Sequence, residues 1–204
     1  MLWVGLGNPG QCYAGNRHNV GFMALDQIVR DYSFSDWKVT TSSATSEGRI
    51  GPVKIQALKP LSFMNKSGLP VANLARYYNL YPDQIIVFHD EIDLNEGRCR
   101  IKQGGGHGGH NGLRDIDRHM SKEYWRVRIG VGRPDHKDDV HKWVLQDFTV
   151  AEHIGWLDRL LAAMSDEAER LATGDPEGFA SRVAFLAPAP QDNVTVNDDE
   201  TDKG

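Results

Sequence analysis

The stretch Ile85-Ile86-Val87-Phe88-His89-Asp90 places four consecutive apolar residues directly before two residues that can titrate. A short, continuous apolar run is typical of a strand that is buried on both faces, as in a parallel sheet. Open α/β sheets place their functional groups at the carboxyl ends of such strands. The stretch therefore predicts a buried strand with Asp90 at its functional end.

Segments on both sides of this strand alternate between strand and helix patterns. The predicted strands are Leu2–Val4, a segment from Ile50 to Leu58 that Gly51-Pro52 interrupts, Arg98–Lys102 and Trp125–Val131. Helical spacing of apolar residues begins near Val20, Pro70, Leu113 and Thr149. Strands interleaved with helices predict a single α/β domain with a twisted mixed β-sheet flanked by helices.

Length and composition predict one folded domain followed by a tail. The chain has 204 residues, of which 40% are hydrophobic and 25% charged, as in an ordinary globular domain with a sizeable core. Residues 188–204 are rich in proline and then acidic, so they cannot bury a core. We assign 1–187 to the folded domain and 188–204 to a disordered acidic tail.

Targeting and cysteine signals favour the cytoplasm. No apolar stretch approaches the ~20 residues of a membrane helix, and the N-terminus lacks the basic and long apolar segments of a secretory signal. Cys12 and Cys99 lack CxxC spacing, so they predict neither a disulfide framework nor a zinc knuckle. We expect a cytoplasmic protein.

The formal net charge of −5 conceals an uneven distribution. Residues 188–204 carry a net charge of −4, which leaves −1 on the remainder. Residues 98–142 hold eleven Lys and Arg against six Asp and Glu, together with five of the eight histidines. A near-neutral body with a basic segment fits an RNA contact, although a solvated surface explains the same charges.

The first glycine motif, Gly5-x-Gly7-x-x-Gly10, follows a predicted strand and suggests a dinucleotide-binding alternative. That alternative requires a helix N-terminus at once, to receive a pyrophosphate. Helical spacing resumes only near Val20, and Asp31, which has the spacing of the required acid, falls at a helix end. The context therefore disfavours a dinucleotide site.

The second glycine motif is Gly104-Gly105-Gly106-His107-Gly108-Gly109-His110-Asn111-Gly112, between a predicted strand and a helix. Its glycines allow a ligand to approach the backbone closely, and the following helix start can hold a phosphate. No Gly-Lys-Ser/Thr follows, so it is not an NTPase loop. A plain flexible loop explains the glycines but not the His-Asn pair.

Isolated polar residues beside strand and helix ends provide the candidate chemistry. His18 precedes the first long helix, Asp90 ends a strand, and Asn65 precedes the next helix. Capping and turn roles account for each residue taken alone. Taken together, they suit a hydrolase in which His activates water, Asp orients it, and amides polarise an acyl group.

Seven segments in order resemble bacterial peptidyl-tRNA hydrolase over about residues 1–185. They are Val4–Gly10, Tyr13, Arg17–Gly21, Phe63–Gly68, His89–Asp93, Gly104–Leu113 and Arg128–Pro134. The resemblance implies a monomeric α/β enzyme without metal or other cofactor. Its implied activity is cleavage of the ester that joins a peptide to the 3′-terminal ribose of tRNA, so residues 1–187 become the implied catalytic domain.

The same resemblance implies roles for individual residues. His18 matches the catalytic histidine and Asp90 the aspartate paired with it. The amides that would place the peptide, the terminal adenosine and the attacking water are Asn8, Asn65 and Asn111. Tyr13 and Met64 match residues lining the same cleft. Lys102 and Arg128 match a basic pair that holds the tRNA 5′-phosphate, and Arg100 keeps the charge of a position that is often Lys.

Two further expectations concern function and motion. Some plant organelle relatives of this family bind RNA for intron splicing without hydrolysing it, which leaves an RNA adaptor as an alternative. The chain has no transit-like Ser/Arg-rich N-terminus. The polar stretch from Asp135 to Asp139 predicts a mobile lid beside the cleft.

Overall fold

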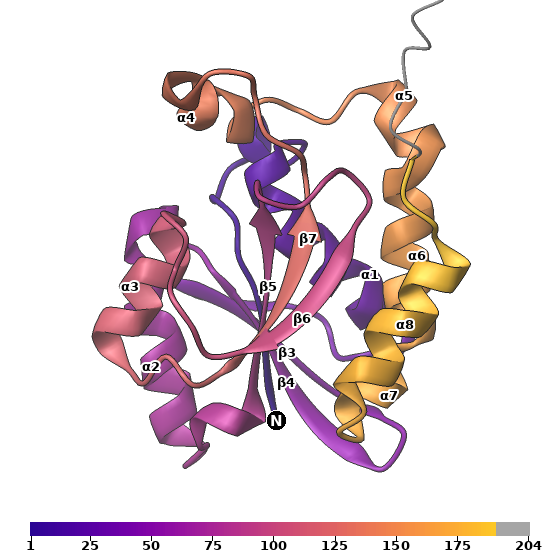
Figure 1. Cartoon of the computed structure of the whole chain (residues 1–204). Helices are drawn as coiled ribbons and strands as arrows, with labels where there is room; N and C mark the ends of the chain where they lie inside the picture. Colours follow the sequence, from indigo (N-terminus) through magenta and orange to yellow (C-terminus); the bar gives the residue numbers. More distant parts are fainter. Residues whose placement is uncertain (191–204) are drawn as a thin grey trace, which may run out of the picture.

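The computed structural model describes residues 1–190, whose seven strands form one sheet in the order β2-β3-β4-β1-β5-β7-β6. The strands are β1 (Leu2–Gly5), β2 (Lys38–Val39), β3 (Ser43–Ile50), β4 (Val53–Pro60), β5 (Ile85–Glu91), β6 (Cys99–Gln103) and β7 (Trp125–Gly130). Strands β4, β1, β5 and β7 are parallel, whereas β2, β3 and β6 pair antiparallel at the two sides. The predicted twisted mixed sheet is confirmed (Figure 1).

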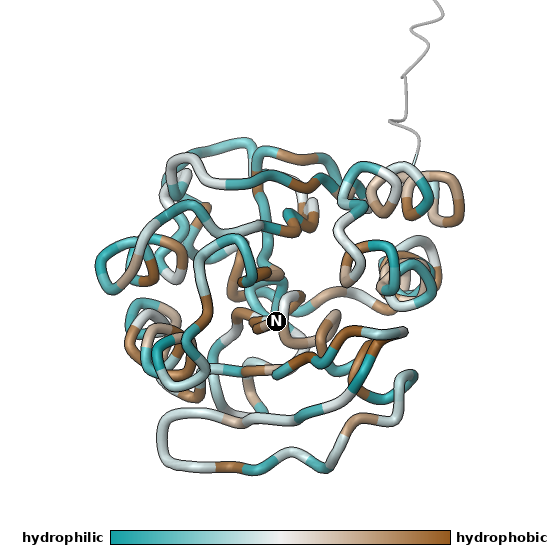
Figure 2. The backbone as a smooth tube through the Cα atoms, turned by 90° about the horizontal axis from the view of Figure 1, so that it is seen from below, coloured by the Kyte–Doolittle hydropathy of each residue, from teal (hydrophilic) through white to brown (hydrophobic). Residues whose placement is uncertain are grey.

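Helices cover both faces of the sheet. The elements are α1 (Val20–Asp31), α2 (Gly68–Tyr77), α3 (Asn111–His119), α6 (Asp158–Asp166), α7 (Ala168–Ala172) and α8 (Pro176–Leu186). Helices α2 and α3 lie on one side, and α6, α7 and α8 lie on the other, which is also plain when the molecule is seen from below (Figures 1 and 2). No helix within residues 1–190 is long and apolar enough to cross a lipid bilayer.

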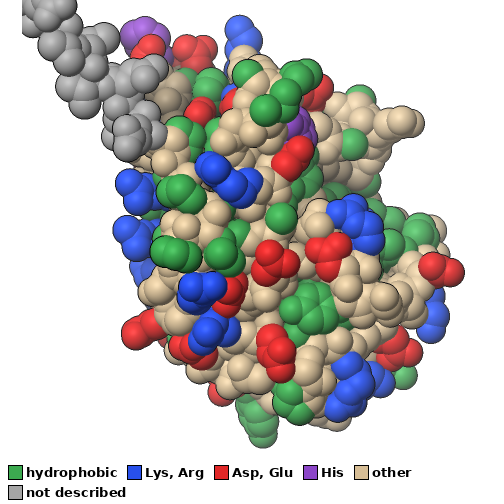
Figure 3. Space-filling model, turned by 90° about the vertical axis from the view of Figure 1, so that its right-hand side faces the viewer, with side chains coloured by type: hydrophobic (Ala, Val, Ile, Leu, Met, Phe, Trp, Pro, Cys, Tyr) green, Lys and Arg blue, Asp and Glu red, His purple; other side chains and the backbone are tan. Residues whose placement is uncertain are grey.

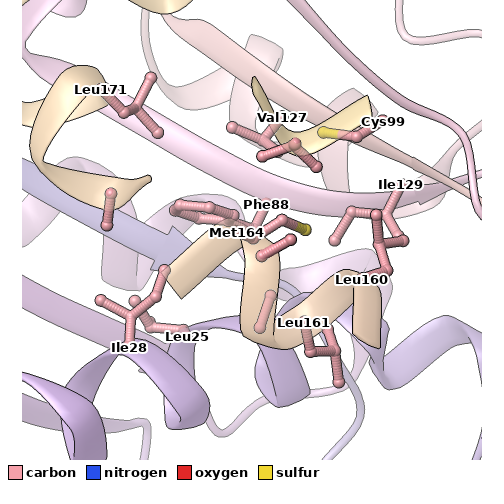
Figure 4. Close-up of a cluster of buried hydrophobic side chains, with 14 of the residues drawn as sticks. Leu25, Ile28, Phe88, Cys99, Val127, Ile129, Leu160, Leu161, Met164 and Leu171 are labelled. Carbon is pink, nitrogen blue, oxygen red and sulfur yellow. The ribbon is translucent and has the colours of Figure 1, made fainter. Parts of the chain in front are cut away.

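Two buried clusters hold these layers together. The larger joins sheet residues such as Phe88 and Val127 to Leu25 of α1 and Leu160 of α6 (Figure 4). The smaller packs the opposite face of the sheet against α2 and α3, with Val87 and Ile116 among its members. Burying each large apolar side chain contributes roughly 1.5–3 kcal/mol. The sheet edge above these clusters is thus a stable platform.

The predicted interrupted strand from Ile50 to Leu58 is wrong in its topology. Strand β3 ends at Ile50, Gly51 and Pro52 form a turn, and β4 returns antiparallel from Val53. Gly51 adopts φ +52°, which glycine tolerates without the steric cost of a side chain. The Gly-Pro pair therefore reverses the chain instead of merely interrupting one strand.

The segment after β7 crosses the edge where the parallel strands end (Figure 1). It contains the short turns and helices η5 (Lys137–Asp139), α4 (Val140–Val144) and α5 (Val150–Glu152), followed by the π-helical turn η6 (His153–Leu157). Thr149 caps α5 by accepting from the N–H of Glu152, whose carboxylate accepts from the Thr149 N–H in return. This crossing segment borders the candidate site.

The predicted boundary between domain and tail falls just after α8, which ends at Leu186. Residues 188–190 are described as chain without regular structure. The remainder of the predicted tail lies outside the described residues. The assignment of 188–204 as a disordered acidic tail stays a prediction.

Candidate active site

A cleft of about 900 Å³ opens where the parallel strands end. That volume is within the range of sites that bind small molecules. The segments that border it follow β1 and β5, precede α2 and α3, and include α4. All residues predicted as catalytic or substrate-binding line it: Asn8, Tyr13, His18, Met64, Asn65, Asp90 and Asn111.

His18 and Asp90 form the centre of the cleft. His18 Nδ1 lies 2.8 Å from Asp90 Oδ1, although the two residues are 72 positions apart in the chain. Both residues are buried, with His18 8% and Asp90 3% exposed. Because Nδ1 donates to the carboxylate, the neutral ring keeps its lone pair on Nε2. His18 can therefore accept a proton on the side away from Asp90.

A close approach of helix α1 to the sheet brings these two side chains together. His18 lies in the single 3₁₀ turn η2 (Arg17–Asn19), which leads directly into α1. The next turn contains Gly21, where a Cβ atom would lie 2.3 Å from the carbonyl oxygen of Phe88. Only glycine permits this contact. The Gly21 position in the Arg-His-Asn-Val-Gly motif thus sets His18 beside the end of β5.

His110 is a third member of this centre, and the predicted site did not include it. Its Nδ1 accepts from the N–H groups of Gly112 and Leu113, so the imidazole caps the N-terminus of α3. Its Nε2 lies 2.9 Å from Asp90 Oδ1. Since Nδ1 faces two donors, the neutral ring must carry its hydrogen on Nε2. Asp90 Oδ1 consequently accepts from both His18 and His110.

The two imidazoles determine the charge of Asp90. Burial by itself raises the pKa of the Asp90 carboxyl, but the facing His18 and His110 hold that pKa well below its usual value. Asp90 is therefore a carboxylate at neutral pH, able to orient His18 and to stabilise the imidazolium that forms during proton transfer.

His18, Asp90 and His110 also form a group whose ligand atoms lie within 4.8 Å of one another, so we tested their fit to a metal ion. A metal bound at His110 Nε2 would need the lone pair there and would move the ring hydrogen to Nδ1. That hydrogen would face the N–H groups of Gly112 and Leu113. The trio is arranged to exchange protons and does not fit a metal.

The predicted amides are held in different ways. Asn8 Oδ1 accepts from the N–H of Met64 at 2.8 Å, and the Asn8 backbone exchanges two hydrogen bonds with the Asn19 side chain. The Asn8 Nδ2 group makes no hydrogen bond within residues 1–190 and stays available to a ligand. Asn111 Oδ1 accepts from Arg114 at 2.6 Å, and the Nδ2 group of Asn111 likewise makes no hydrogen bond in the described part of the chain. Asn65 is exposed at the rim.

A smaller cavity of about 90 Å³ lies beside the cleft and contains the predicted phosphate residues. Lys102 and Arg128 line it, whereas Arg100 does not, although Arg100 is the cross-strand neighbour of Arg128. Arg128 Nε donates to Glu91 Oε2 at 2.9 Å. Glu91 lines both cavities and so marks their boundary.

His89 is buried at this smaller cavity, and no role was predicted for it from the sequence. Its Nδ1 donates to the backbone oxygen of Asp90, while its Nε2 has no partner within residues 1–190. Burial, reinforced by nearby His110, lowers the pKa of His89 to about 3. His89 therefore stays neutral over the physiological range. A histidine directly before the functional aspartate was the only available signal for it.

The dinucleotide alternative finds no support in the geometry. Gly10 adopts φ 110° and leads into the short turn η1 (Gln11–Tyr13), and the first long helix begins only at Val20. The N-terminus of α1 packs against this motif, but its Phe22 N–H already donates to the Leu6 oxygen, so the helix start is not left open for a pyrophosphate. In the second glycine motif, Gly104, Gly105, Gly108 and Gly109 all have positive φ, as a glycine-specific loop requires.

The fold and the centre by themselves define a class of protein. An imidazole held by a buried carboxylate, with Nε2 open to a cleft at the strand ends, is the arrangement of a hydrolase that activates water, built here on an α/β fold. The predicted lid also borders this cleft, since Lys137 and Asp138 line it. The mobility of that segment stays a prediction.

Comparisons with known proteins specify the family. The family model described as peptidyl-tRNA hydrolase matches residues 2–191. A curated peptidyl-tRNA hydrolase of Dinoroseobacter shibae is 52% identical over 190 residues, which cover 93% of this chain and 80% of that protein. A second, of Rhodospirillum centenum, is also 52% identical over 190 residues, covering 93% of this chain and 83% of the relative.

A solved structure agrees with these sequences. The crystal structure of peptidyl-tRNA hydrolase from Acinetobacter baumannii matches with a TM-score of 0.86 at 36% identity, over 92% of this chain and 96% of that chain. The chain therefore belongs to the peptidyl-tRNA hydrolase family. The resemblance seen in the sequence motifs is confirmed.

Proposed function

We propose that this chain hydrolyses the ester between a peptide, or an N-blocked amino acid, and the 3′-terminal ribose of tRNA, with His18 as the general base. The activity itself is peptidyl-tRNA hydrolysis, which the family match and the solved relative support. The observation that carries the mechanism is the 2.8 Å contact of His18 Nδ1 with Asp90, which leaves Nε2 facing the cleft.

The reaction begins with water bound beside His18. Nε2 takes a proton from the water as its oxygen attacks the ester carbonyl, and the imidazolium formed is stabilised by Asp90. Collapse of the tetrahedral intermediate breaks the bond to the ribose oxygen, and the imidazolium returns its proton to that oxygen. The products are a peptide with a free carboxyl group and tRNA with an intact ribose.

Amide donors stabilise the negative charge of the intermediate. The Nδ2 group of Asn8, whose Oδ1 is already fixed by Met64, is preorganised for that role. One such donor is typically worth ~2.7–4 kcal/mol of transition-state stabilisation. Asn111 and Asn65 place the water and the terminal adenosine, and Tyr13 and Met64 contact the same end of the substrate.

The rest of the tRNA binds at the smaller cavity. Lys102 and Arg128 hold the 5′-phosphate there, and Arg100 adds charge from the neighbouring position on β6. The chain acts as a cytoplasmic monomer. Its unpaired Cys12 and Cys99 agree with a reducing compartment.

Turnover of N-acetyl-aminoacyl-tRNA by the purified chain tests the function directly. We expect multiple turnovers that release N-acetyl-amino acid and leave the tRNA intact. Tight binding of the RNA without release of the amino acid would favour the RNA-adaptor alternative and overturn the esterase assignment. A minimal N-acetyl-aminoacyl nucleoside should also be cleaved, because the proposed chemistry needs only the cleft.

A further inference from the structure

The segment 143–152, which crosses the strand ends, is attached to the chain on the amino side of His18 by a pair of extended backbones. The N–H of Arg17 donates to the oxygen of Gln146 at 3.0 Å, and the N–H of Phe148 donates to the oxygen of Gly15 at 2.8 Å. The Nδ2 group of Asn16 donates to Asp147 Oδ1 at 2.6 Å. The catalytic loop and the crossing segment therefore form one local unit.

Arg17 lies at the centre of this unit and is only 4% exposed. Its guanidinium donates to Glu152 Oε1 at 2.6 Å and to the backbone oxygen of Asp147 at 2.9 Å. The same group lies over the Trp143 ring, 4.1 Å from its centroid, and 5.3 Å from the centroid of Phe148. A planar guanidinium presents five donors in a fixed fork and stacks flat on aromatic rings, so it fits this set of carboxylate, carbonyl and ring better than a compact ammonium group does.

Trp143 extends the connection to the cleft wall. Its indole N–H donates to the backbone oxygens of Val131 and Gly132, just after β7. Trp143 belongs to α4, and the neighbouring residues Val140, Val144 and Leu145 line the cleft. Arg17 thus lies between His18, its neighbour in sequence, and the helix that forms the wall facing the substrate.

We propose that Arg17 is a positioning residue that locks helix α4 to the catalytic loop and so sets the width of the cleft at His18. The inference rests on the proposed esterase function. Arg17 neither lines the cleft nor contacts Asp90, so it acts through Trp143, Glu152 and the loop that carries His18. Motion of the predicted lid, Asp135–Asp139, then does not extend beyond Trp143.

Arg17→Lys is the primary test, because it keeps the charge but loses the planar group that fits the Trp143 ring and two acceptors. Misplacement of a catalytic group by about 1 Å can cost 10²-fold in rate. We expect a milder loss of about tenfold in kcat/KM on both tRNA-linked and minimal N-acetyl-aminoacyl substrates, shared between a higher KM and a lower kcat. Glu152→Gln should act in the same direction, to a smaller extent.

Hydrogen–deuterium exchange supplies a readout that needs no substrate. In Arg17→Lys, we expect faster exchange at the N–H groups of Arg17 and Phe148, with the central strands β1 and β5 unchanged. A general loss of stability would instead accelerate exchange throughout the sheet. Native-state cleavage by trypsin after Lys142 should rise, while cleavage in the β3–β4 hairpin should not.

Lys59 offers a matched control for the loss of a cation held by a ring and a carboxylate. Its Nζ lies 4.2 Å from the Trp37 ring centroid and 2.6 Å from Asp26, and it does not line the cleft. Lys59→Met should leave kcat, KM and exchange in segment 143–152 unchanged.

The outcomes separate this inference from the proposed function. An inactive wild-type chain would sink the function, and with it the kinetic part of the inference. An active wild type whose Arg17→Lys variant shows kcat/KM within about twofold of normal would overturn the positioning role, as would a loss of kcat/KM without faster exchange in segment 143–152.

Discussion

Asp90 and Arg128 stand on adjacent parallel strands, yet the protein holds them in opposite ways. Asp90 is 3% exposed and accepts two hydrogen bonds at Oδ1 from imidazoles on separate loops. Arg128 is fixed through Nε alone, by Glu91. Its remaining N–H groups make no hydrogen bond within residues 1–190, and Lys102 forms no ion pair there. We therefore expect function at Asp90 to depend on exact hydrogen-bond geometry, and ligand binding at Arg128 and Lys102 to depend on long-range charge.

The difference indicates how each site should respond to change. A buried centre with fixed tautomers loses function when one group is removed, because neighbouring groups cannot replace it. Lys102 is exposed and Arg128 half-buried, and cations in such open settings act through the field they share, so loss of one is partly covered by the others. The face formed by α6 and α8 is unlike both, since basic, acidic and apolar side chains intermingle over the described part of it (Figure 3).

His18→Ala should give the largest effect. We expect turnover to fall by the ~10²–10⁴-fold typical of general-base loss, with tRNA binding and thermal stability close to normal. Steady-state hydrolysis of N-acetyl-aminoacyl-tRNA measures it. His141→Ala is the matched control, because His141 lines the same cleft but is exposed and makes no hydrogen bond to Asp90. Near-normal turnover in His18→Ala would contradict the mechanism.

His110 both caps α3 and bonds to Asp90, and its replacement can separate these two roles. His110→Ala removes both the cap of α3 and the hydrogen bond to Asp90, whereas His110→Ser keeps a hydroxyl that can cap the helix. We expect both variants to lose roughly ten- to a hundredfold in kcat, with the serine variant more stable by about 1 kcal/mol. Denaturant unfolding together with kcat provides the measurement. A serine variant with full kcat would show that His110 serves only as a cap.

The residues in these two predictions differ in how far the sequence alone could reveal them. The contact between His18 and Asp90 was predictable because a histidine before a helix and an acid at a strand end stood in recognisable motifs. The His110 bond to Asp90 was not, because its tautomer depends on where α3 begins and how the glycine loop returns. The hydrogen-bond partners of the Arg17 guanidinium lie 129 to 135 positions away, beyond any local pattern.

The fold was predictable wherever periodicity was strong. The apolar run before His89 predicted β5 correctly, and the predicted strand Trp125–Val131 matches β7 to within one residue. The β3–β4 hairpin was missed because Ser43–Gly48 consists of polar residues, Ala and Gly, so the sequence shows no hydrophobic alternation that would suggest a strand. Pairing with β4, rather than local propensity, forms β3.

His89 should make stability depend on acid pH. The pKa of His89 is lowered to about 3 by burial, whereas a free histidine titrates at 6.5. Between these values the unfolded chain binds a proton that the folded chain refuses, so stability is lost as pH falls from 6.5 towards 3. The loss at pH 5 is about 2 kcal/mol. Because Asn can donate to the same backbone oxygen, His89→Asn should flatten this dependence.

Thermal unfolding at pH 7 and pH 5 measures the effect of His89→Asn, with the exposed His136→Asn as control. The control should keep the wild-type difference between the two pH values. An unchanged difference in His89→Asn as well would show that other groups, and not the buried imidazole, cause the acid sensitivity.

Removal of the cations should give the smallest effect, and one that depends on salt. If Lys102 and Arg128 hold a phosphate as proposed, Lys102→Ala and Arg128→Ala each delete one such contact, so the slope of log affinity against log salt should shrink by about 0.7 to 0.9. We expect the KM for full-length peptidyl-tRNA to rise by up to about tenfold at low salt. A minimal substrate that lacks the 5′-phosphate end should be cleaved normally.

Lys38→Ala removes one exposed charge at the opposite side of the sheet and controls for net charge alone. Turnover of both substrates at two salt concentrations decides the question. Equal losses on the long and minimal substrates would mean that the pair supports the cleft itself, and the contrast between a geometric and an electrostatic site would then fail.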